Sequence, residues 1–221
     1  NLRFKIHAKF KRHLYKKKIK KIDRFSKSLI LIFEDTSGFI IHLGMSGTIH
    51  LCDKNKKNTI TNTSFYHSPI LPKKHNHVEI QFDKIKFIYN DPRRFGYFKL
   101  LIKNFIHESP LNNLGPEPFS TSFNLFYIKK FIKNKKTNVK NLLMDQTFVC
   151  GLGNIYVNEV LFMSKIKPSR KCNNLNNNEI KNLIMNIRKI LKFSISKGGS
   201  SIKDFENTFG ETGNFQQFFY V

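Results

Sequence analysis

The sequence has few cysteines, few acidic residues and no long hydrophobic run, and each shortage excludes a class of protein. Its three cysteines, Cys52, Cys150 and Cys172, lie far apart without a C-x-x-C pair, so neither a disulfide framework nor a zinc ribbon is expected. The longest apolar runs, such as residues 29–33, are far shorter than the roughly 20 residues that span a bilayer, and no signal peptide opens the chain. We therefore expect a cytoplasmic protein with no membrane partner.

The shortage of acidic residues leaves a large positive charge. Lys and Arg number 39 against 15 Asp and Glu, which gives a formal net charge of +24. Such a charge attracts polyanions, nucleic acid above all. However, Lys, Asn, Ile and Phe are abundant throughout, as a strongly AT-biased genome would produce. Charge alone therefore leaves two interpretations open, a nucleic-acid partner or compositional drift on solvated faces.

The hydrophobic pattern changes near the middle of the 221 residues, which predicts two domains and the α+β fold class. In residues 1–106, short β-branched and aromatic runs predict an antiparallel β-sandwich. Its strands are expected at 28–34, 39–42, 47–52, 77–82, 85–89 and 97–102. Residues 107–120 hold three prolines and predict an interdomain linker. Residues 121–207 show helical periodicity. Its helices are expected at 122–133, 139–145, 155–164 and 178–196.

A glycine-bearing turn separates two of the predicted helices. Residues 150–153 read Cys-Gly-Leu-Gly and lead into Asn154, which can cap the second helix. The free amides and the positive dipole end of such a helix can receive a phosphate. The turn therefore indicates a unit that binds a DNA backbone, and the alternative is a plain turn between two core helices.

Six motifs are distributed over nearly the whole chain. They are His42 to Gly47, Asp91 to Gly96, Leu114 to Pro118, Leu143 to Gln146, Gly151 to Tyr156 and Gly198 to Phe205. In this order and at about this spacing, they resemble the bacterial formamidopyrimidine-DNA glycosylase (Fpg/MutM) family. The related endonuclease VIII branch shares the helical motifs but not the Asp-Pro-Arg-Arg-Phe-Gly loop. The resemblance implies a β-sandwich followed by a helix-two-turn-helix domain, and a base excision repair glycosylase and AP lyase that removes 8-oxoguanine and formamidopyrimidines.

The resemblance assigns roles to residues of the first domain. Met45, Arg93 and Phe95 match side chains that fill the gap left by an extruded base, with Arg93 bound to the widowed cytosine. The alternative places Met45 and Phe95 in a core and makes Arg93 and Arg94 a surface pair. Lys27 matches the proton donor of the elimination step, a catalytic role, although the same side chain also suits a phosphate.

Further matching positions hold DNA phosphates or surround the flipped base. The phosphate positions are those of His42, His75, Lys136 and Asn154, with Lys135 as an ambiguous neighbour of Lys136. Glu159 and Lys203 match positions around the base, where a carboxylate accepts from a base edge and a glycine-hinged loop closes. The expected partner is duplex DNA with an oxidised purine opposite cytosine, bound by a monomer.

The ends of the chain do not match those of the family. The resemblance implies a nucleophilic N-terminal proline amine and a C-terminal four-cysteine zinc finger, whereas this sequence begins at Asn1. Residues 208–221 match the segment that leads into the finger. We therefore expect an inactive fragment of a zinc-containing enzyme, with no zinc ligands in this chain. The alternative is an eroded gene whose product binds damaged DNA without cleaving it.

Overall fold

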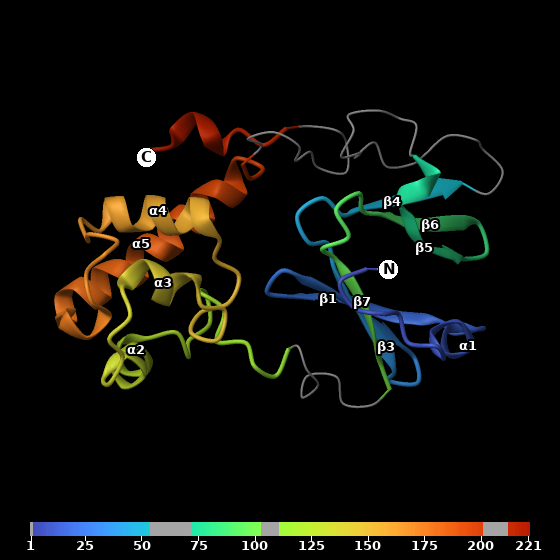
Figure 1. The fold of residues 1–221 in the computed structure, drawn as a ribbon, viewed down its shortest axis with the longest axis horizontal. Helices are drawn as coiled ribbons and strands as arrows, with labels where there is room; N and C mark the ends of the chain where they lie inside the picture. The colour runs from blue at the N-terminus through green and yellow to red at the C-terminus, as the bar shows by residue number, and fades with distance from the viewer. Residues whose placement is uncertain (1, 54–71, 103–110, 201–211) are drawn as a thin grey trace. The chain divides into compact units, whose positions relative to one another are not determined.

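The computed structural model describes residues 2–53, 72–102, 111–200 and 212–221, which fall into two compact units (Figure 1). The first unit includes the described residues up to Ile102. The second includes those from Leu111 to Gly199 and from Asn214 to Val221. Apart from one short helix before the first strand, strands come first in the chain and helices afterwards, which confirms the α+β class.

Two antiparallel sheets form most of the first unit. One has the strand order β1-β2-β3-β7, from β1 (Ile19–Phe25), β2 (Ser28–Phe33), β3 (Gly38–His42) and β7 (Tyr97–Leu101). The other has the order β4-β6-β5, from β4 (Thr48–Asp53), β5 (Asn76–Gln81) and β6 (Ile85–Asn90). A short helix, α1 (Phe10–Leu14), precedes β1.

Aromatic side chains from both sheets form the core of the first unit. Phe39 and Phe98 of the larger sheet stack with ring centres 5.9 Å apart. Phe98 also meets Phe87 and Tyr89 of the smaller sheet edge-on, at 6.2 and 5.0 Å. All four rings are buried, so the two sheets share one core as a sandwich requires.

The sequence pattern did not predict β1 or α1. β1 is an edge strand with five consecutive exposed residues, so it lacks the alternation of a half-buried strand. α1 has only five residues, too few to establish a helical period. Both elements depend on tertiary contacts, as the burial of Phe10 against Phe39 illustrates.

Helices form the second unit, and each lies within three residues of its predicted range. They are α2 (Leu125–Ile132), α3 (Val139–Met144), α4 (Asn154–Met163) and α5 (Asn177–Ser196). Their apolar faces bury a single cluster that includes Leu143, Phe148, Val157 and Leu183. Within the described residues, no helix is long and apolar enough to cross a bilayer.

Two segments outside the four helices also belong to the second unit. Residues 111–120 form part of the predicted linker, yet the Arg188 guanidinium of α5 donates to the Pro118 carbonyl at 2.9 Å. At the other end of the chain, Phe215 is 2% exposed within the helical core. The second unit therefore includes segments on both sides of the four helices in the chain.

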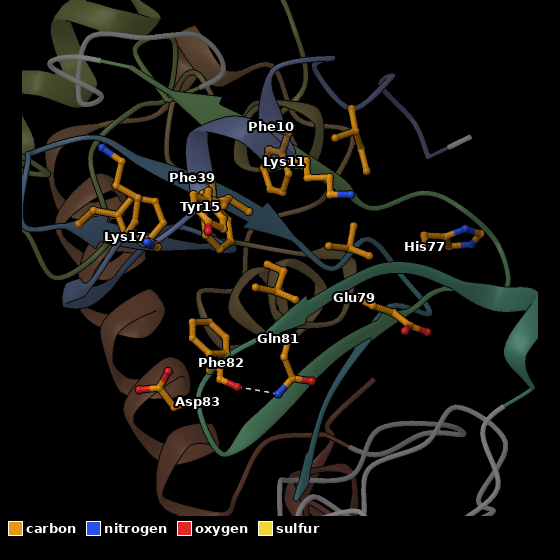
Figure 2. Close-up of a pocket in the computed structure, with 16 residues that line it drawn as sticks. Phe10, Lys11, Tyr15, Lys17, Phe39, His77, Glu79, Gln81, Phe82 and Asp83 are labelled. Carbon is orange, nitrogen blue, oxygen red and sulfur yellow. Dashed lines mark hydrogen bonds between the residues drawn. The ribbon is translucent and has the colours of Figure 1, made fainter. Parts of the chain in front are cut away.

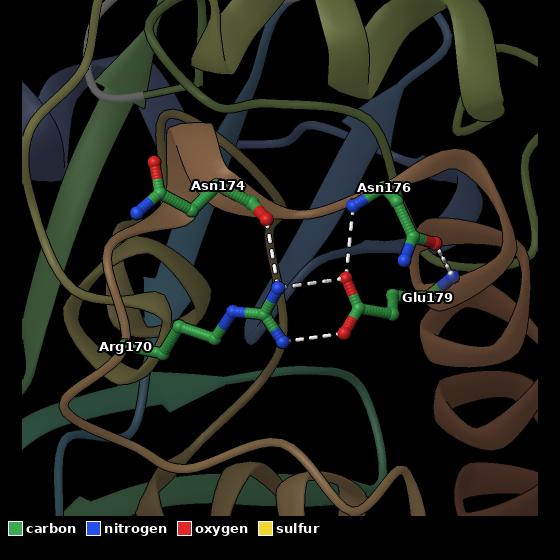
Figure 3. A network of polar contacts seen from close by, with 4 residues as sticks. All are labelled: Arg170, Asn174, Asn176 and Glu179. Atoms are coloured by element: carbon green, nitrogen blue, oxygen red, sulfur yellow. Dashed lines mark hydrogen bonds and ion pairs between the residues drawn. The ribbon is translucent and has the colours of Figure 1, made fainter.

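A complete capping box begins α5 (Figure 3). The Asn176 side chain accepts a hydrogen bond from the Glu179 N–H at 2.9 Å, and the Glu179 carboxylate accepts one from the Asn176 N–H at 2.8 Å. Arg170 forms an ion pair with the same carboxylate. The pKa of Glu179 is held below its usual value, mainly by the hydrogen bond from the Asn176 N–H and also by Arg170.

We expect Asn176→Ala to lower the free energy of unfolding by about 1 kcal/mol, because the first turn of α5 loses its cap. Chemical denaturation followed by circular dichroism measures the change. Asn176→Ser keeps an acceptor oxygen and should recover most of the loss. Equal unfolding midpoints for Asn176→Ala and the wild type would contradict the capping role.

Candidate nucleic-acid interface

Two loops of the first unit carry the side chains predicted to fill a gap in DNA. Residues 43–47 follow β3, and residues 91–96 follow β6. Met45 is 71% exposed and Phe95 46% exposed, and the guanidinium carbon of Arg93 lies 4.9 Å from the centre of the Phe95 ring. Their exposure rules out a core role for Met45 and Phe95. Large apolar side chains that are exposed close together are typical of surfaces that meet a partner, and Gly44, next to Met45, lies against Phe95.

A buried polar network joins the two loops. Asp91 is fully buried, and its Oδ1 accepts a hydrogen bond from the Ser46 hydroxyl at 2.5 Å. Its Oδ2 accepts from the Tyr89 hydroxyl at 3.0 Å and from the Gly96 N–H at 2.9 Å. The Ser46 oxygen in turn accepts from the Arg93 N–H at 3.2 Å. The two loops therefore share one hydrogen-bonded centre.

The backbones of the loops are also in direct contact. Gly44 has a φ of +69°, a conformation that residues with a Cβ rarely adopt, and a Cβ there would lie 2.7 Å from the Gly96 nitrogen. A Cβ on Gly96 would overlap the Tyr89 hydroxyl. Glycine is therefore required on both sides of this contact.

No role was predicted for Ser46, Tyr89 or Asp91, although Ser46 and Asp91 lie within two of the six motifs. One signal was present, because Tyr89 and Asp91 stand two residues apart at the end of a predicted strand and so project to the same face. Ser46, however, is 45 residues from Asp91, and no local pattern connects such a pair.

His42 lies at the end of β3 beside the first loop. Its ring stacks on Tyr97 with centres 5.2 Å apart, and its Nδ1 accepts from the Gly44 N–H at 3.0 Å. The neutral ring therefore carries its proton on Nε2. Burial, then the positive charges of Lys27 and Arg3, lowers the pKa of His42. A neutral imidazole held in this way can donate from Nε2 to a phosphate oxygen.

The lowered pKa of His42 predicts a loss of stability in acid. The unfolded chain protonates His42 near pH 6.5, while the folded chain does so only at lower pH. The contribution to stability is thus present above pH 6.5 and is lost as the pH falls through the folded pKa. His42→Gln should lose less stability than the wild type between about pH 7.5 and about pH 5, measured by thermal denaturation. Identical losses would contradict this.

In the chain, Lys27 precedes both loops and His75 lies between them. Lys27 is exposed in the turn between β1 and β2, where its charge acts on His42. His75 ends the short turn η1 (Lys73–His75), and its carbonyl accepts from the Asp91 N–H at 3.0 Å. A ring nitrogen of His77 bonds the Asp91 carbonyl at 2.9 Å. The structure thus brings Lys27 near His42 and ties His75 to the second loop.

In the second unit, the turn before α4 differs from the prediction. Gly153 is the N-cap, and Asn154 is the first helical residue, with no side-chain capping bond at this helix end. The Gln146 side chain secures the turn, since it donates to the Leu152 carbonyl at 3.0 Å and accepts from the Gly151 N–H at 2.9 Å. The predicted cap is therefore wrong. The Asn154 side chain is instead exposed at the positive end of α4.

Two predicted lysines follow α2, and both are exposed. The Lys135 ammonium lies 4.5 Å from the centre of the Phe131 ring. The carbonyl of Lys135 accepts from the Cys172 thiol at 3.4 Å, which fixes the backbone beside Lys136. Both side chains thus extend from an anchored segment, and their contacts with phosphate remain a prediction.

Glu159, which the resemblance predicts at the flipped base, is buried in the second unit. Its side chain is 1% exposed, and its two oxygens accept from the N–H groups of Tyr220 at 2.8 Å and Val221 at 3.1 Å. A role at a flipped base would require these two bonds to be released. Lys203, the other residue predicted at the base, lies outside the described residues.

The residues that the structure describes do not fit a zinc site. They contain no group of three or more His, Cys, Asp or Glu side chains that could hold a metal ion. Burial raises the pKa of the Cys52 and Cys172 thiols, whereas zinc binds thiolates. We therefore assign no chemical step to a metal.

An open pocket of about 710 Å³ is a separate feature of the first unit (Figure 2). Phe10, Phe39 and Phe82 are among its apolar walls, and Lys11 and Asp83 are among its charged groups. None of the predicted site residues lines it. The pocket is connected to the second loop through His77, which lines it and also bonds the Asp91 carbonyl.

Comparisons with known proteins agree with these observations. Two family models match the chain: the Formamidopyrimidine-DNA glycosylase N-terminal domain over residues 1–98 and the Formamidopyrimidine-DNA glycosylase H2TH domain over residues 114–206. Over 218 residues, 98% of this chain and 74% of each relative, the sequence is 36% identical to the formamidopyrimidine-DNA glycosylase of Rickettsia felis and 39% identical to that of Psychromonas ingrahamii. Among solved structures, it is similar to Lactococcus lactis Fpg in complexes with DNA containing an abasic site (TM-score 0.81) or Fapy-dG (TM-score 0.80). Both are 32% identical and cover 96% of this chain and 73% of theirs.

Proposed function

The chain belongs to the formamidopyrimidine-DNA glycosylase family, and from this membership we propose that it removes oxidised purines opposite cytosine from duplex DNA. The observation that carries the proposal is the presentation of Met45, Arg93 and Phe95 on two loops with one buried centre. An enzyme that acts on a base must take it out of the stack, which leaves a gap that costs a few kcal/mol unless side chains fill it.

The three exposed side chains have complementary chemistry for this gap. Met45 is flexible and apolar, so it can occupy the space of the extruded base. Phe95 offers a flat ring that can wedge against a neighbouring base, and the Arg93 guanidinium beside it can donate to the acceptors of the unpaired cytosine. A plain basic surface would need neither the methionine nor the phenylalanine.

Phosphate contacts complete the proposed interface. His42 offers its Nε2–H, while Lys27 and Lys136 offer charge. Asn154 offers an exposed amide at the N-terminal end of α4, where the helix dipole favours an anion. Contacts of this kind position a protein without reading sequence, which suits an enzyme that must find damage anywhere.

In the proposed reaction an amine attacks the sugar C1′ and expels the damaged base, and the resulting Schiff base allows an elimination that nicks the strand. In this chain we assign Lys27 a part in that elimination, as proton donor. Its exposed position in the β1–β2 turn, with its charge acting on the ring of His42, supports this assignment. Lys27→Ala should therefore slow strand nicking more than base release.

Borohydride trapping tests the proposal. The complete gene product is incubated with a duplex that carries 8-oxoguanine opposite cytosine, and we expect a covalent protein–DNA adduct together with free base. If neither the adduct nor the free base were detected, the glycosylase proposal would be overturned. If the protein still bound abasic DNA in preference to undamaged DNA, the alternative of a binding protein without activity would replace it.

A further inference from the structure

We infer that Asp91 is a positioning residue that makes the two loops one unit, so that Met45, Arg93 and Phe95 enter DNA together. The inference rests on the proposed function, which supplies the DNA. Asp91 itself is fully buried, so it acts through the residues that it holds. Ser46 and Tyr89 are its partners in this role.

The network is attached at the residues that flank the exposed side chains. Asp91 bonds Ser46, which directly follows Met45, and Gly96, which directly follows Phe95. The Ser46 oxygen also accepts the N–H of Arg93 itself. Each of the three exposed side chains is therefore held at its own backbone N–H or through the residue that follows it, and a movement of one loop is transmitted to the other.

Tyr89 supplies a second link between the loops. Its hydroxyl lies within hydrogen-bonding distance of both the Asp91 carboxylate, at 3.0 Å, and the Leu43 carbonyl of the first loop, at 3.2 Å. The ring itself is fully buried in the sandwich core, where it packs against Phe98. The shared centre of the loops is thus anchored to the closely packed core of the unit.

A carboxylate is needed at this position because three donors converge on two oxygens. Oδ1 receives the Ser46 hydroxyl, and Oδ2 receives the Tyr89 hydroxyl and the Gly96 N–H. An asparagine would keep only one acceptor oxygen and would direct an NH₂ group at a donor. Asp91→Asn should therefore disconnect one of the two loops, even though the side chain keeps its size.

The first arm of the test compares two buried serines in the free protein. Ser46 and Ser37 are 3% and 2% exposed, and each hydroxyl donates to an aspartate, at 2.5 and 2.6 Å. Ser46→Ala should accelerate amide hydrogen exchange in both loops, from 43 to 47 and from 91 to 96. Ser37→Ala, the matched control, should affect only the turn around Asp35. Faster exchange confined to the first loop in Ser46→Ala would overturn the coupling.

The second arm measures base release in a single turnover with the complete protein. Ser46→Ala should slow release about ten- to hundredfold, because misplaced groups lose much of their effect. Affinity for undamaged duplex should stay constant. In a Met45→Ala background the same change should slow release by a smaller factor, since one of the three side chains that it positions is already absent. Equal slowing in Ser46→Ala and Ser37→Ala, or full additivity with Met45→Ala, would overturn the inference.

The two arms separate this inference from the proposed function. If the wild type released no oxidised purine, the proposed function would fail, and the exchange comparison would still decide whether the loops are coupled. If the wild type released the base and Ser46→Ala released it at the same rate, the proposed function would stand and the positioning role of the network would be rejected.

Discussion

Substituting alanine for Gly96 should remove most of the base-release activity and lower the free energy of unfolding by about 1–3 kcal/mol. The new Cβ would overlap the Tyr89 hydroxyl and lie 2.6 Å from the His42 carbonyl oxygen, so the loop or the ring must move. Because the Gly96 N–H and the Tyr89 hydroxyl both donate to Asp91, the movement displaces Phe95 and Arg93. Single-turnover kinetics and chemical denaturation measure the two effects.

Gly38→Ala is the matched control for this substitution. A Cβ on Gly38 would overlap the Leu31 carbonyl, so the change also forces backbone apart in the first unit, but at the opposite end of β3 from His42. We expect a comparable loss of stability with nearly normal base release from the molecules that remain folded. Equal loss of activity per folded molecule in both variants would show that Gly96 matters only for folding.

Arg93→Ala should slow removal of 8-oxoguanine opposite cytosine by about 10- to 100-fold, since one good contact between a side chain and a base is worth about 1–3 kcal/mol. The effect should be much smaller when the lesion stands opposite adenine, because the contact proposed for Arg93 is with cytosine. The preference for cytosine should therefore largely disappear. Base release from the two duplexes under single-turnover conditions measures it.

Arg94→Ala removes the same charge from the neighbouring residue. Arg94 has a φ of +60°, and its N–H donates to the Asp91 carbonyl at 3.3 Å, a backbone bond that alanine keeps. We expect weaker binding to both duplexes by a similar factor and an unchanged preference for cytosine. A loss of that preference in Arg94→Ala but not in Arg93→Ala would reverse the roles of the two arginines.

The elements whose burial is periodic could be predicted from the sequence. α5 buries Ile180, Leu183, Ile184 and Ile187 at helical spacing, so the order of apolar and polar residues alone indicates the helix. β1 was not predicted, because its lysine-rich middle has no buried face to impose a period. A sequence pattern indicates an element only where its side chains alternate between buried and exposed, and the exposed edge strand β1 shows no such alternation.

The candidate site likewise has a part that the sequence predicts and a part that it does not. The motifs predicted a shared role for Met45, Arg93 and Phe95, and the structure adds that all three are exposed and that Arg93 lies beside the Phe95 ring. The hydrogen-bond network that joins the two loops could not be predicted, because it connects Ser46 to an aspartate 45 residues away. The burial of Glu159 against Tyr220 is likewise a contact over 61 residues, beyond the reach of any helical pattern.

The neutral donors around Asp91 have a consequence for ionic strength. The loops are held by hydroxyl and amide groups bonded to a carboxylate that solvent ions do not reach, so added salt screens these contacts little. Lysine contacts with phosphate weaken steeply under the same conditions. Salt should therefore weaken the capture of DNA while leaving the rate of base release from an already engaged lesion almost constant. Ionic strength should thus change the residence time of the protein on undamaged DNA without altering the arrangement of the side chains proposed to enter at damage.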